Sequence, residues 1–299
     1  MMTAVVLGAE DDPVWCDEHG RVKVRILGLD PLDEANPQAH DTTAWVRVDF
    51  MWAGDGFGII FPLWAGMEVS LGWDQGAVER PVITGCRYNS RNVPPRFDHL
   101  GCLPHNRALN GIVTREHNGP QQQQLRFNNT HGKVSTQLGT DHAATQLNMG
   151  CLSTPMNEGW TEPRGHGIEL LTDGHGVMRA GDGMLITTEA RPKAQGHITD
   201  MAETVERLTT GQTQHDNLST AAQQAKAHET GDQDEVVQAL KAQAAEIKGH
   251  GGNPAQGKFP EFQAPHLTLA SPAGIQTTTQ GSTHVASVEH NAFTSGLPT

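Results

Sequence analysis

Histidine has the widest chemical scope of the side chains in this sequence, because its imidazole ligates metals and transfers protons near neutral pH. The 299-residue chain contains 16 histidines. Six of them are candidate ligands: His131, His142, His166, His175, His284 and His290. None belongs to an HxH pair or stands at ligand spacing from a cysteine. The sequence therefore predicts no metal-binding residues, no cofactor-binding residues and no cofactor within a single chain.

Catalytic motifs are also missing from the sequence. It contains no GxSxG turn, no HExxH motif and no phosphate-binding P-loop. No pair of carboxylates has the context of a glycosidase cleft. We therefore predict no catalytic residues and a protein that is not an enzyme.

Aromatic side chains are concentrated between residues 45 and 73, where they could stack on single-stranded nucleic acid or sugars. They are Trp45, Trp52, Phe57, Phe61, Trp64 and Trp73. The formal net charge is −13, so the chain lacks the basic surface that attracts nucleic acid phosphates. We favour packing inside a small core for these residues. Binding of polysaccharide or nucleic acid is the competing hypothesis.

Composition points to thin, turn-rich β structure. Only 36% of the residues are hydrophobic and 5% aromatic, and the chain has 33 glycines. The four cysteines lack a CxxC pair, which fits free thiols in a reducing cytosol, although disulfides remain open. We find no apolar stretch that could span a bilayer and no signal peptide. Export, if it occurs, is expected to need another machine.

The elements of the first region are predicted strands separated by breakers. Apolar alternation or short apolar runs occur at 22–26, 45–50, 58–61, 69–73 and 81–85. Five such strands suit a small Greek-key barrel of the oligonucleotide/oligosaccharide-binding (OB) type. Periodicity alone allows an SH3-like barrel equally well.

Short strands also recur further along the chain. Alternating pairs occur at 168 and 170, 177 and 179, and 185 and 187. Further along, two series of residues recur every eight positions. The first is Leu267, Ile275, Thr283 and Asn291, and the second is Leu269, Thr277, Val285 and Phe293. An octad of strand plus turn predicts a β-helix or β-prism.

In a single chain, the edges of such short strands would keep backbone N–H and C=O groups without hydrogen-bond partners. We therefore predict an obligate homotrimer whose shaft is an intertwined β-prism, with Thr277, Thr279, Thr283 and Val285 packed along the axis. A histidine that points toward that axis would lie next to the same histidine of the other two chains. The three imidazoles could hold a metal ion, and this is the one arrangement in which we expect one.

Residues 199–248 change to a helical period. Asp200 precedes Glu203 by three residues, and Asp232 precedes Glu235 likewise, which predicts two capping boxes with a break at 230–232. The expected apolar faces are Met201, Val205 and Leu208 on one helix and Val236, Leu240, Ala244 and Ile247 on the other. The pattern predicts a helical hairpin laid against the prism. A docking surface for an effector or its adaptor is the alternative.

Three stretches of the sequence resemble a known family. These are residues 45–88 (WVRVDFMWAGDGFGIIFPLWAGMEVS…), 109–150 (LNGIVTREHNGPQQQQLRFNN…) and 164–191 (RGHGIELLTDGHGVMRAGDGMLITTEAR). They are similar to VgrG, the valine-glycine-repeat spike of type VI secretion systems, and to phage baseplate spikes. The resemblance implies an OB collar at 1–97, a neck and first shaft segment at 98–198, the helical insertion at 199–248, and a linker with distal shaft at 249–299.

The same resemblance implies function and partners. The expected role is a homotrimeric, membrane-puncturing spike that carries effectors into target cells; an effector-recruiting adaptor on the spike and a phage-like baseplate spike are alternatives. The protein would be loaded in the bacterial cytoplasm, then secreted, touching the target membrane transiently. A tip protein of the proline-alanine-alanine-arginine-repeat family would bind near residues 285–299, and no nucleic acid is expected.

The sequence also departs from the family pattern. VgrG proteins normally begin with a phage-hub-like domain that contacts the inner-tube protein, whereas this sequence begins at the barrel. Residues 98–120 are too few for the lysozyme domain of phage relatives, and TSGLPT follows the last repeats with no room for a toxin domain. The resemblance thus also implies a non-catalytic spike.

Overall fold

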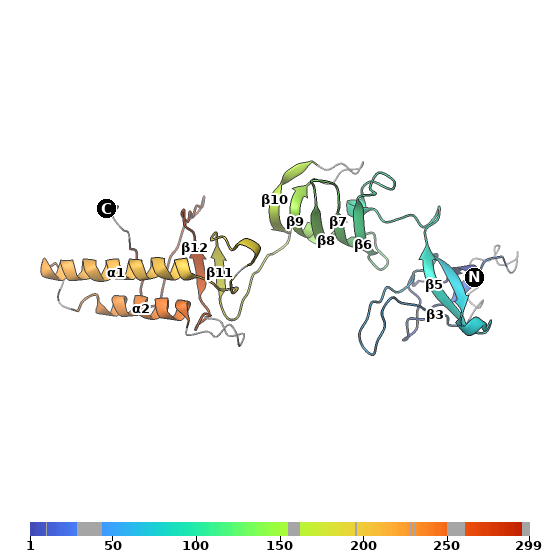
Figure 1. Ribbon diagram of the computed structural model, residues 1–299, viewed down its shortest axis with the longest axis horizontal. Coiled ribbons are helices and arrows are strands. Elements are labelled where there is room, and N and C mark those ends of the chain that lie inside the picture. The colour runs from blue at the N-terminus through green and yellow to red at the C-terminus, as the bar shows by residue number, and fades with distance from the viewer. Residues whose placement is uncertain are drawn as a thin grey trace. The chain divides into compact units, whose positions relative to one another are not determined.

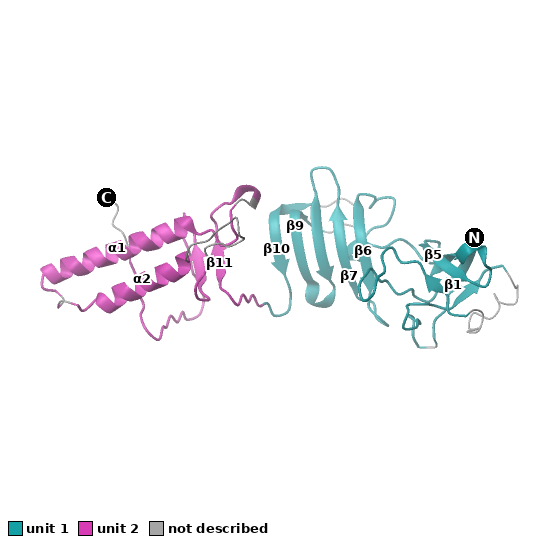
Figure 2. Cartoon of the chain, turned by 60° about the horizontal axis from the view of Figure 1, so that its bottom comes forward, with its two compact units in different colours: residues 1–176 teal, residues 177–299 magenta. Residues whose placement is uncertain are grey.

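The computed structural model describes residues 1–9, 11–28, 44–154, 162–194, 196–227, 229, 231–249 and 261–294. It divides the chain into two compact units, Met1–Gly176 and Val177–Thr299 (Figure 2). Within the linker and distal shaft expected at 249–299, residues 250–260 and residues 295–299 of the expected tip contact lie outside the described residues.

The first sheet contains five strands: β1 (Met2–Val6), β2 (Val24–Ile26), β3 (Arg47–Val48), β4 (Glu68–Trp73) and β5 (Pro81–Arg87). Their order is β2-β1-β4-β5-β3, with every pair antiparallel except β3 and β5. The strand expected at 58–61 was wrong, because Gly58 only bridges to Ala53 within a hairpin. Strand β1 takes the remaining place in the sheet and was not among the expected strands.

The core of this sheet is aliphatic. The largest side chains that are less than 2% exposed are Val6, Val22, Val24, Val46, Val69, Leu71 and Ile83. The core packing expected for the six aromatic residues was wrong for Trp52, Phe57 and Phe61, which are 59%, 61% and 47% exposed, whereas Trp45, Trp64 and Trp73 are half-buried. Branched aliphatic side chains suit a narrow pleated interior, which leaves the larger rings outside.

A second sheet is an antiparallel meander of β6 (Leu109–Arg115), β7 (Gln122–Asn128), β8 (Ser135–Thr140), β9 (Thr145–Ser153) and β10 (Pro163–Leu171). Each strand pairs with the next along the chain (Figure 1). The recurrence expected around 168–187 is only partly present, because Val177 and Arg179 lie in no strand. Tight turns between sequential strands, and not an octad repeat, set the spacing here.

Gly111 permits the close pairing of β6 with β7. Its φ is +149°, and a Cβ there would lie 1.9 Å from the carbonyl oxygen of Leu125. We expect Gly111→Ala to destabilise the sheet by about 1–3 kcal/mol, because the backbone must shift and the residue is strained. Thermal unfolding measures the loss. Gly139→Ala in β8 is the matched control, since its Cβ would meet no atom closer than 3.6 Å; equal effects would contradict the explanation.

The second unit contains two helices between two paired strands. Strands β11 (Met184–Thr187) and β12 (Leu267–Ala270) are parallel, and α1 (Ala202–Gln224) and α2 (Asp234–Lys248) lie between them in sequence (Figure 1). Short 3-10 turns complete the elements: η1 (Asp74–Gly76), η2 (Phe97–His99), η3 (His142–Ala144) and η4 (Pro192–Ala194). The predicted mainly β fold with a helical hairpin is confirmed.

The reciprocal capping boxes expected at the helix starts were wrong, although Asp200 Oδ1 accepts a hydrogen bond from Ala202 N in the first turn of α1 at 3.4 Å. The N-cap residues are Met201 and Gln233, and neither makes a side-chain cap hydrogen bond. Glu203 accepts a hydrogen bond from Arg191. No described helix is long and apolar enough to cross a membrane.

The two series of residues expected after β12 lack strands in the single chain. Residues 271–294 form no strand, and Ile275, Val285 and Phe293 are 57%, 66% and 87% exposed. A short extended segment needs neighbouring strands to satisfy its backbone groups. The intertwined shaft therefore stays a prediction.

Candidate functional site

One face of the second sheet carries a continuous row of aliphatic side chains. The register places opposite one another, strand by strand, Ile112, Leu125, Leu138, Leu147 and Leu170. A second row on the same face contains Phe127, Met149 and Ile168. Alternate residues of a strand share a face, so the two rows form one surface, here called the aliphatic face.

The aliphatic face is exposed. Ile112, Leu138 and Leu170 are 45%, 57% and 71% exposed, and Ile168 is 72% exposed. A cavity of about 690 Å³ lies over this face, with Phe61 contributing to its wall. Contiguous apolar surface of this kind marks an interaction site in soluble proteins.

The opposite face of the sheet is polar and buried. Gln124, Gln137 and Asn148 are 9%, 3% and 8% exposed. Gln124 Nε2 donates to Gln137 Oε1, and Gln137 Nε2 donates to Gln146 Oε1 at 2.9 Å. Asn148 Nδ2 continues the chain by donating to Glu169 Oε2 at 3.0 Å. These side chains, called the polar ladder, satisfy each other across the strands.

Charged pairs close both ends of the polar ladder. At one end, Asp98 on η2 accepts from Arg126 and, at 2.6 Å, from Gln124 Nε2. At the other end, Arg164 donates to both oxygens of Glu169, at 3.0 and 2.6 Å. The Arg164 hydrogen bond lowers the pKa of Glu169, although burial opposes this shift. The single chain thus buries the polar side of this sheet and exposes the apolar side.

Truncation within the polar ladder is expected to be costly. Gln137→Ala removes the hydrogen bonds from Gln124 Nε2 and to Gln146 Oε1, while Asp98 and Asn148 still bind these two atoms. Each lost hydrogen bond contributes about 0.5–1.5 kcal/mol, so the thermal midpoint should fall by several degrees. Differential scanning calorimetry measures this shift. Thr136→Ala, on the other face of β8, serves as control and should change stability much less.

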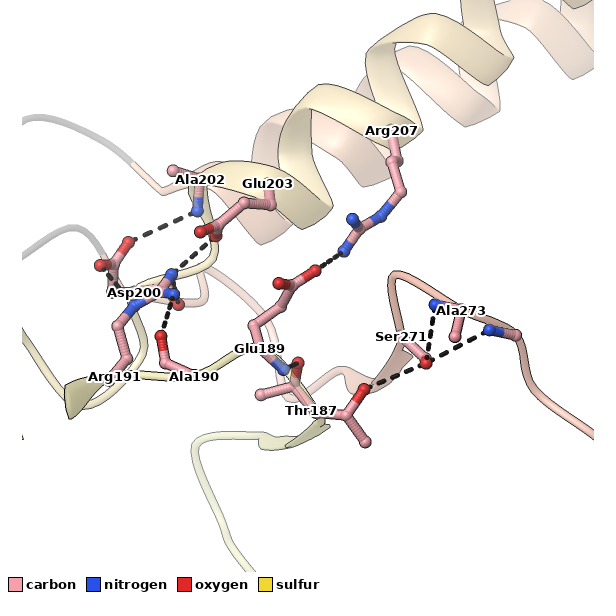
Figure 3. A network of polar contacts seen from close by, with 12 residues as sticks. Thr187, Glu189, Ala190, Arg191, Asp200, Ala202, Glu203, Arg207, Ser271 and Ala273 are labelled. Atoms are coloured by element: carbon pink, nitrogen blue, oxygen red, sulfur yellow. Dashed lines mark hydrogen bonds and ion pairs between the residues drawn. The ribbon is translucent and has the colours of Figure 1, made fainter.

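A network of ion pairs holds the base of the helical insertion (Figure 3). Arg191 Nε donates to Asp200 Oδ2 at 3.0 Å, and its Nη2 donates to Glu203 Oε2 at 2.6 Å. Arg207 Nη2 on α1 donates to Glu189 Oε1 at 2.6 Å. These contacts, called the base clamp, join the first two turns of α1 to the segment after β11.

The base clamp shifts the pKa values of two of its groups, Arg191 and Glu203. The hydrogen bond to Glu203, followed by that to Asp200, raises the pKa of Arg191. The hydrogen bond from Arg191 lowers the pKa of Glu203 below its ordinary value of 4.5. Arg191 and Glu203 are therefore both charged at neutral pH.

The helical hairpin has a weak apolar seam. The structure buries Met201 and Ile247 of the expected faces, but Leu208 is 37% exposed. Val237 is buried at 5% where Val236 was expected; Val236 instead lines a cavity of about 620 Å³ between α2 and residues 287–292. The buried side chains of α1 are Thr204 and Ser219, which are both small and polar. Little apolar packing therefore holds α1, and we expect the ion pairs of the base clamp to fix its position.

The six histidines singled out from the sequence are all exposed in the single chain. Among the described residues, no three metal-ligating side chains lie together. Other histidines pair with carboxylates: His117 with Asp12 at 2.9 Å and His99 with Asp141 at 2.7 Å. These partners lie 105 and 42 positions apart, so no sequence spacing could have revealed them.

Three sequence families match the chain. Residues 115–222 match a putative type VI secretion system Rhs element Vgr, and residues 3–88 match the type VI secretion system/phage-baseplate injector OB domain. Residues 254–299 match a family of uncharacterized proteins conserved in bacteria. The OB prediction for the first sheet is thereby confirmed.

Curated relatives carry spike names. The chain is 34% identical over 273 residues to the type VI secretion system spike protein VgrG2a of Pseudomonas aeruginosa, covering 91% of this chain and 31% of the relative. VgrG2b of the same strain is also 34% identical, with 91% and 25% covered. The chain therefore spans about a third or less of these relatives. The actin cross-linking toxin VgrG1 of Vibrio cholerae matches at 34% over 46% of this chain, but over only 12% of the toxin.

Solved structures agree with the sequence relatives. "The VgrG spike from the Type 6 secretion system" has a TM-score of 0.51 and 27% identity, covering 64% of each chain. A structure of the Tle1 effector bound to the VgrG spike gives the same TM-score and identity, covering 64% of this chain and 52% of that chain. Family, fold and OB domain thus agree across sequence and structure.

Proposed function

The chain belongs to the VgrG family of type VI secretion spike proteins, and on this premise we propose that it assembles as a homotrimeric, non-catalytic spike. The observation that carries the proposal is the exposed aliphatic face. A large aliphatic side chain gains about 1.5–3 kcal/mol on full burial. Three copies of the face around one axis would remove these side chains from water together.

The proposed parts follow the order of the chain. Residues 1–97 form the collar, 98–198 the neck and first shaft segment, 199–248 the insertion, and 249–299 the linker and distal shaft. Residues 271–294 would gain in the trimer the strand neighbours that a single chain does not supply. Ladders shared between chains make a stiff rod without a thick core, which suits a protein that pierces membranes.

The proposed partners are effectors or their adaptors, a tip protein and the inner-tube protein. Effectors or their adaptors would bind to it, as the Tle1 effector is bound to the VgrG spike in the solved complex. A proline-alanine-alanine-arginine-repeat tip protein would cap the distal end, and a hub domain would join the spike to the inner-tube protein. The assembly would be loaded in the bacterial cytoplasm and then delivered into a target cell. An axial metal held by three copies of one histidine remains part of the proposal.

Oligomeric state tests the proposed function. Mass photometry of the purified chain should give a trimer, and electron microscopy should show rods with a globular collar. A stable folded monomer at micromolar concentration would refute the proposal. It would then favour the competing idea of a ligand-binding OB protein.

The insertion supports a second candidate role, recruitment of an effector or adaptor. Leu208 and Leu218 are 37% and 61% exposed on α1, and the base clamp fixes where the hairpin begins. Deleting residues 200–248 tests this role, because β11 and β12 remain with enough chain for a parallel crossover. Loss of cargo co-purification from an intact trimer would support recruitment. Unchanged cargo and delivery would exclude it.

A further inference from the structure

Helix α2 carries an apolar stripe that the helical hairpin covers only in part. Val236, Ala239 and Leu240 stand at positions i, i+3 and i+4, so they share one side of the helix. All three are half-buried, whereas the neighbouring Val237 is buried. The side of α2 formed by Val236, Ala239 and Leu240 is called the outer stripe.

Residues 287–292 lie opposite the outer stripe, and all of them except Asn291 line a cavity of about 620 Å³ together with it. Ser287 Oγ donates to His290 O at 2.7 Å, and the chain bends at residues 288 and 289. This bent segment, called the cover, shields the outer stripe with residues that follow both strands of the second unit.

The cover is held loosely. Within the described part of the chain, no hydrogen bond or ion pair joins residues 287–292 to α2. Val288 is fully exposed, and the cavity between the cover and α2 is not filled by side chains. Atoms that border a void lose their dispersion contacts on that side, so an incompletely packed segment is weakly bound. The cover can therefore leave α2 at low cost.

The proposed shaft needs the same residues in another conformation. Val285 and Phe293, which flank the cover, belong to the series that recurs every eight positions. A shaft strand is extended and pairs its backbone groups with neighbouring strands. The cover is instead bent, and residues 271–294 form no strand in the single chain. The bend closed by Ser287 and a shaft strand therefore exclude each other.

Assembly supplies the free energy that moves the cover. Leaving α2 exposes more of two half-buried aliphatic side chains, Val236 and Leu240. The proposed trimer buries a larger set on the aliphatic face, which includes the well-exposed Leu138 and Ile168, and it also pairs the backbone of residues 271–294. The balance favours release of the cover once three chains meet.

We propose that the cover shields the outer stripe in the unassembled chain and leaves it when three chains form the shaft. The insertion then presents the outer stripe on the finished spike only. An effector or adaptor that binds through apolar side chains is recruited by the assembled spike and not by single chains. This inference rests on the proposed trimer, and it gives the second candidate role a location, the outer stripe, and a condition, assembly.

Hydroxyl-radical footprinting of the full chain tests the inference. Side-chain oxidation is measured by mass spectrometry in the wild-type trimer and in a Leu138→Asp single chain. We expect Val236 and Leu240 to be oxidised several-fold faster in the trimer. Leu218, which is 61% exposed on α1 and lines no part of the cavity, should react equally fast in both. Equal rates at Val236 and Leu240 in the two samples would overturn the inference and leave the trimer standing. A wild type without trimers would refute the proposed function, and the inference with it.

Replacement of the cover gives an independent measurement in the single chain. Exchanging residues 287–292 for alternating glycine and serine in the Leu138→Asp chain should raise the oxidation rates of Val236 and Leu240 to those of the wild-type trimer. The control exchanges residues 276–281, an equally long stretch outside strands and helices that lines no part of the cavity. It should leave both rates unchanged. Unchanged rates without the cover, or an equal rise in the control, would contradict the inference.

Discussion

Leu138→Asp is expected to abolish the trimer while leaving the single chain folded. Leu138 is 57% exposed in the centre of the aliphatic face, so one chain loses little packing. In the trimer, three carboxylates would enter an apolar interface, where each unpaired charge costs several kcal/mol. The association constant should fall by about 100-fold or more, since each factor of ten corresponds to 1.4 kcal/mol. Mass photometry across a concentration series measures the change.

Controls separate assembly from folding in this experiment. Val78→Asp places the same charge at a residue that is 78% exposed and lies outside the aliphatic face. It should leave the trimer intact. Far-ultraviolet circular dichroism should show that the Leu138→Asp chain retains its sheets. Trimers of Leu138→Asp at the wild-type concentration would show that the aliphatic face is not the interface.

Arg191→Met should free the base of the helical insertion. The variant keeps much of the side-chain length but removes the donors to Asp200 and Glu203, leaving two carboxylates close together. Because α1 buries mainly Thr204 and Ser219, little apolar packing compensates. Backbone amides in the first two turns of α1 should exchange with deuterium several-fold faster. Arg179→Met is the control, since Arg179 is exposed and lies outside the base clamp.

Acid should have the same effect as the Arg191 substitution. The pKa of Glu203 is lowered below its ordinary value of 4.5 in the folded protein. Its contribution to stability is therefore present above pH 4.5 and is lost as the pH falls through the lower folded pKa. Exchange in early α1 should accelerate in that acidic range for the wild type but much less for Arg191→Met. Equal pH responses would show that the base clamp does not hold the insertion.

The periodicity of apolar residues predicted where strands and helices lie better than it predicted which side chains are buried. Alternation at 69–73 and 81–85 coincides with β4 and β5, and the helical period between 199 and 248 coincides with α1 and α2. These patterns are local, since they depend on the geometry of successive residues. The run at 58–61 misled because exposed apolar residues of a hairpin give the same signal as a buried strand.

The wrong helix caps have a related cause. Asp200 and Glu203 stand at the spacing of a capping box, and Asp200 keeps a long hydrogen bond from Ala202 N, but Arg191 offers charged donors to both carboxylates. A charge-assisted hydrogen bond outweighs a neutral backbone donor at an exposed helix start. Arg191 precedes the helix by eleven positions, so spacing within the helix could not reveal this competition.

The sequence by itself determined most strands of the first sheet and the two helices, and it contains no catalytic motif of the kinds sought. A period of two divides β7–β9 into a leucine face and an amide face, but it does not say which face is covered. The tertiary structure decided that Gln124, Gln137 and Asn148 are buried while Leu138 is exposed. The reason is that burial depends on cross-strand partners and on Asp98 and Arg126, which come together only in the folded chain. Trp52, Phe57 and Phe61, which were expected in the core, are exposed for the same reason.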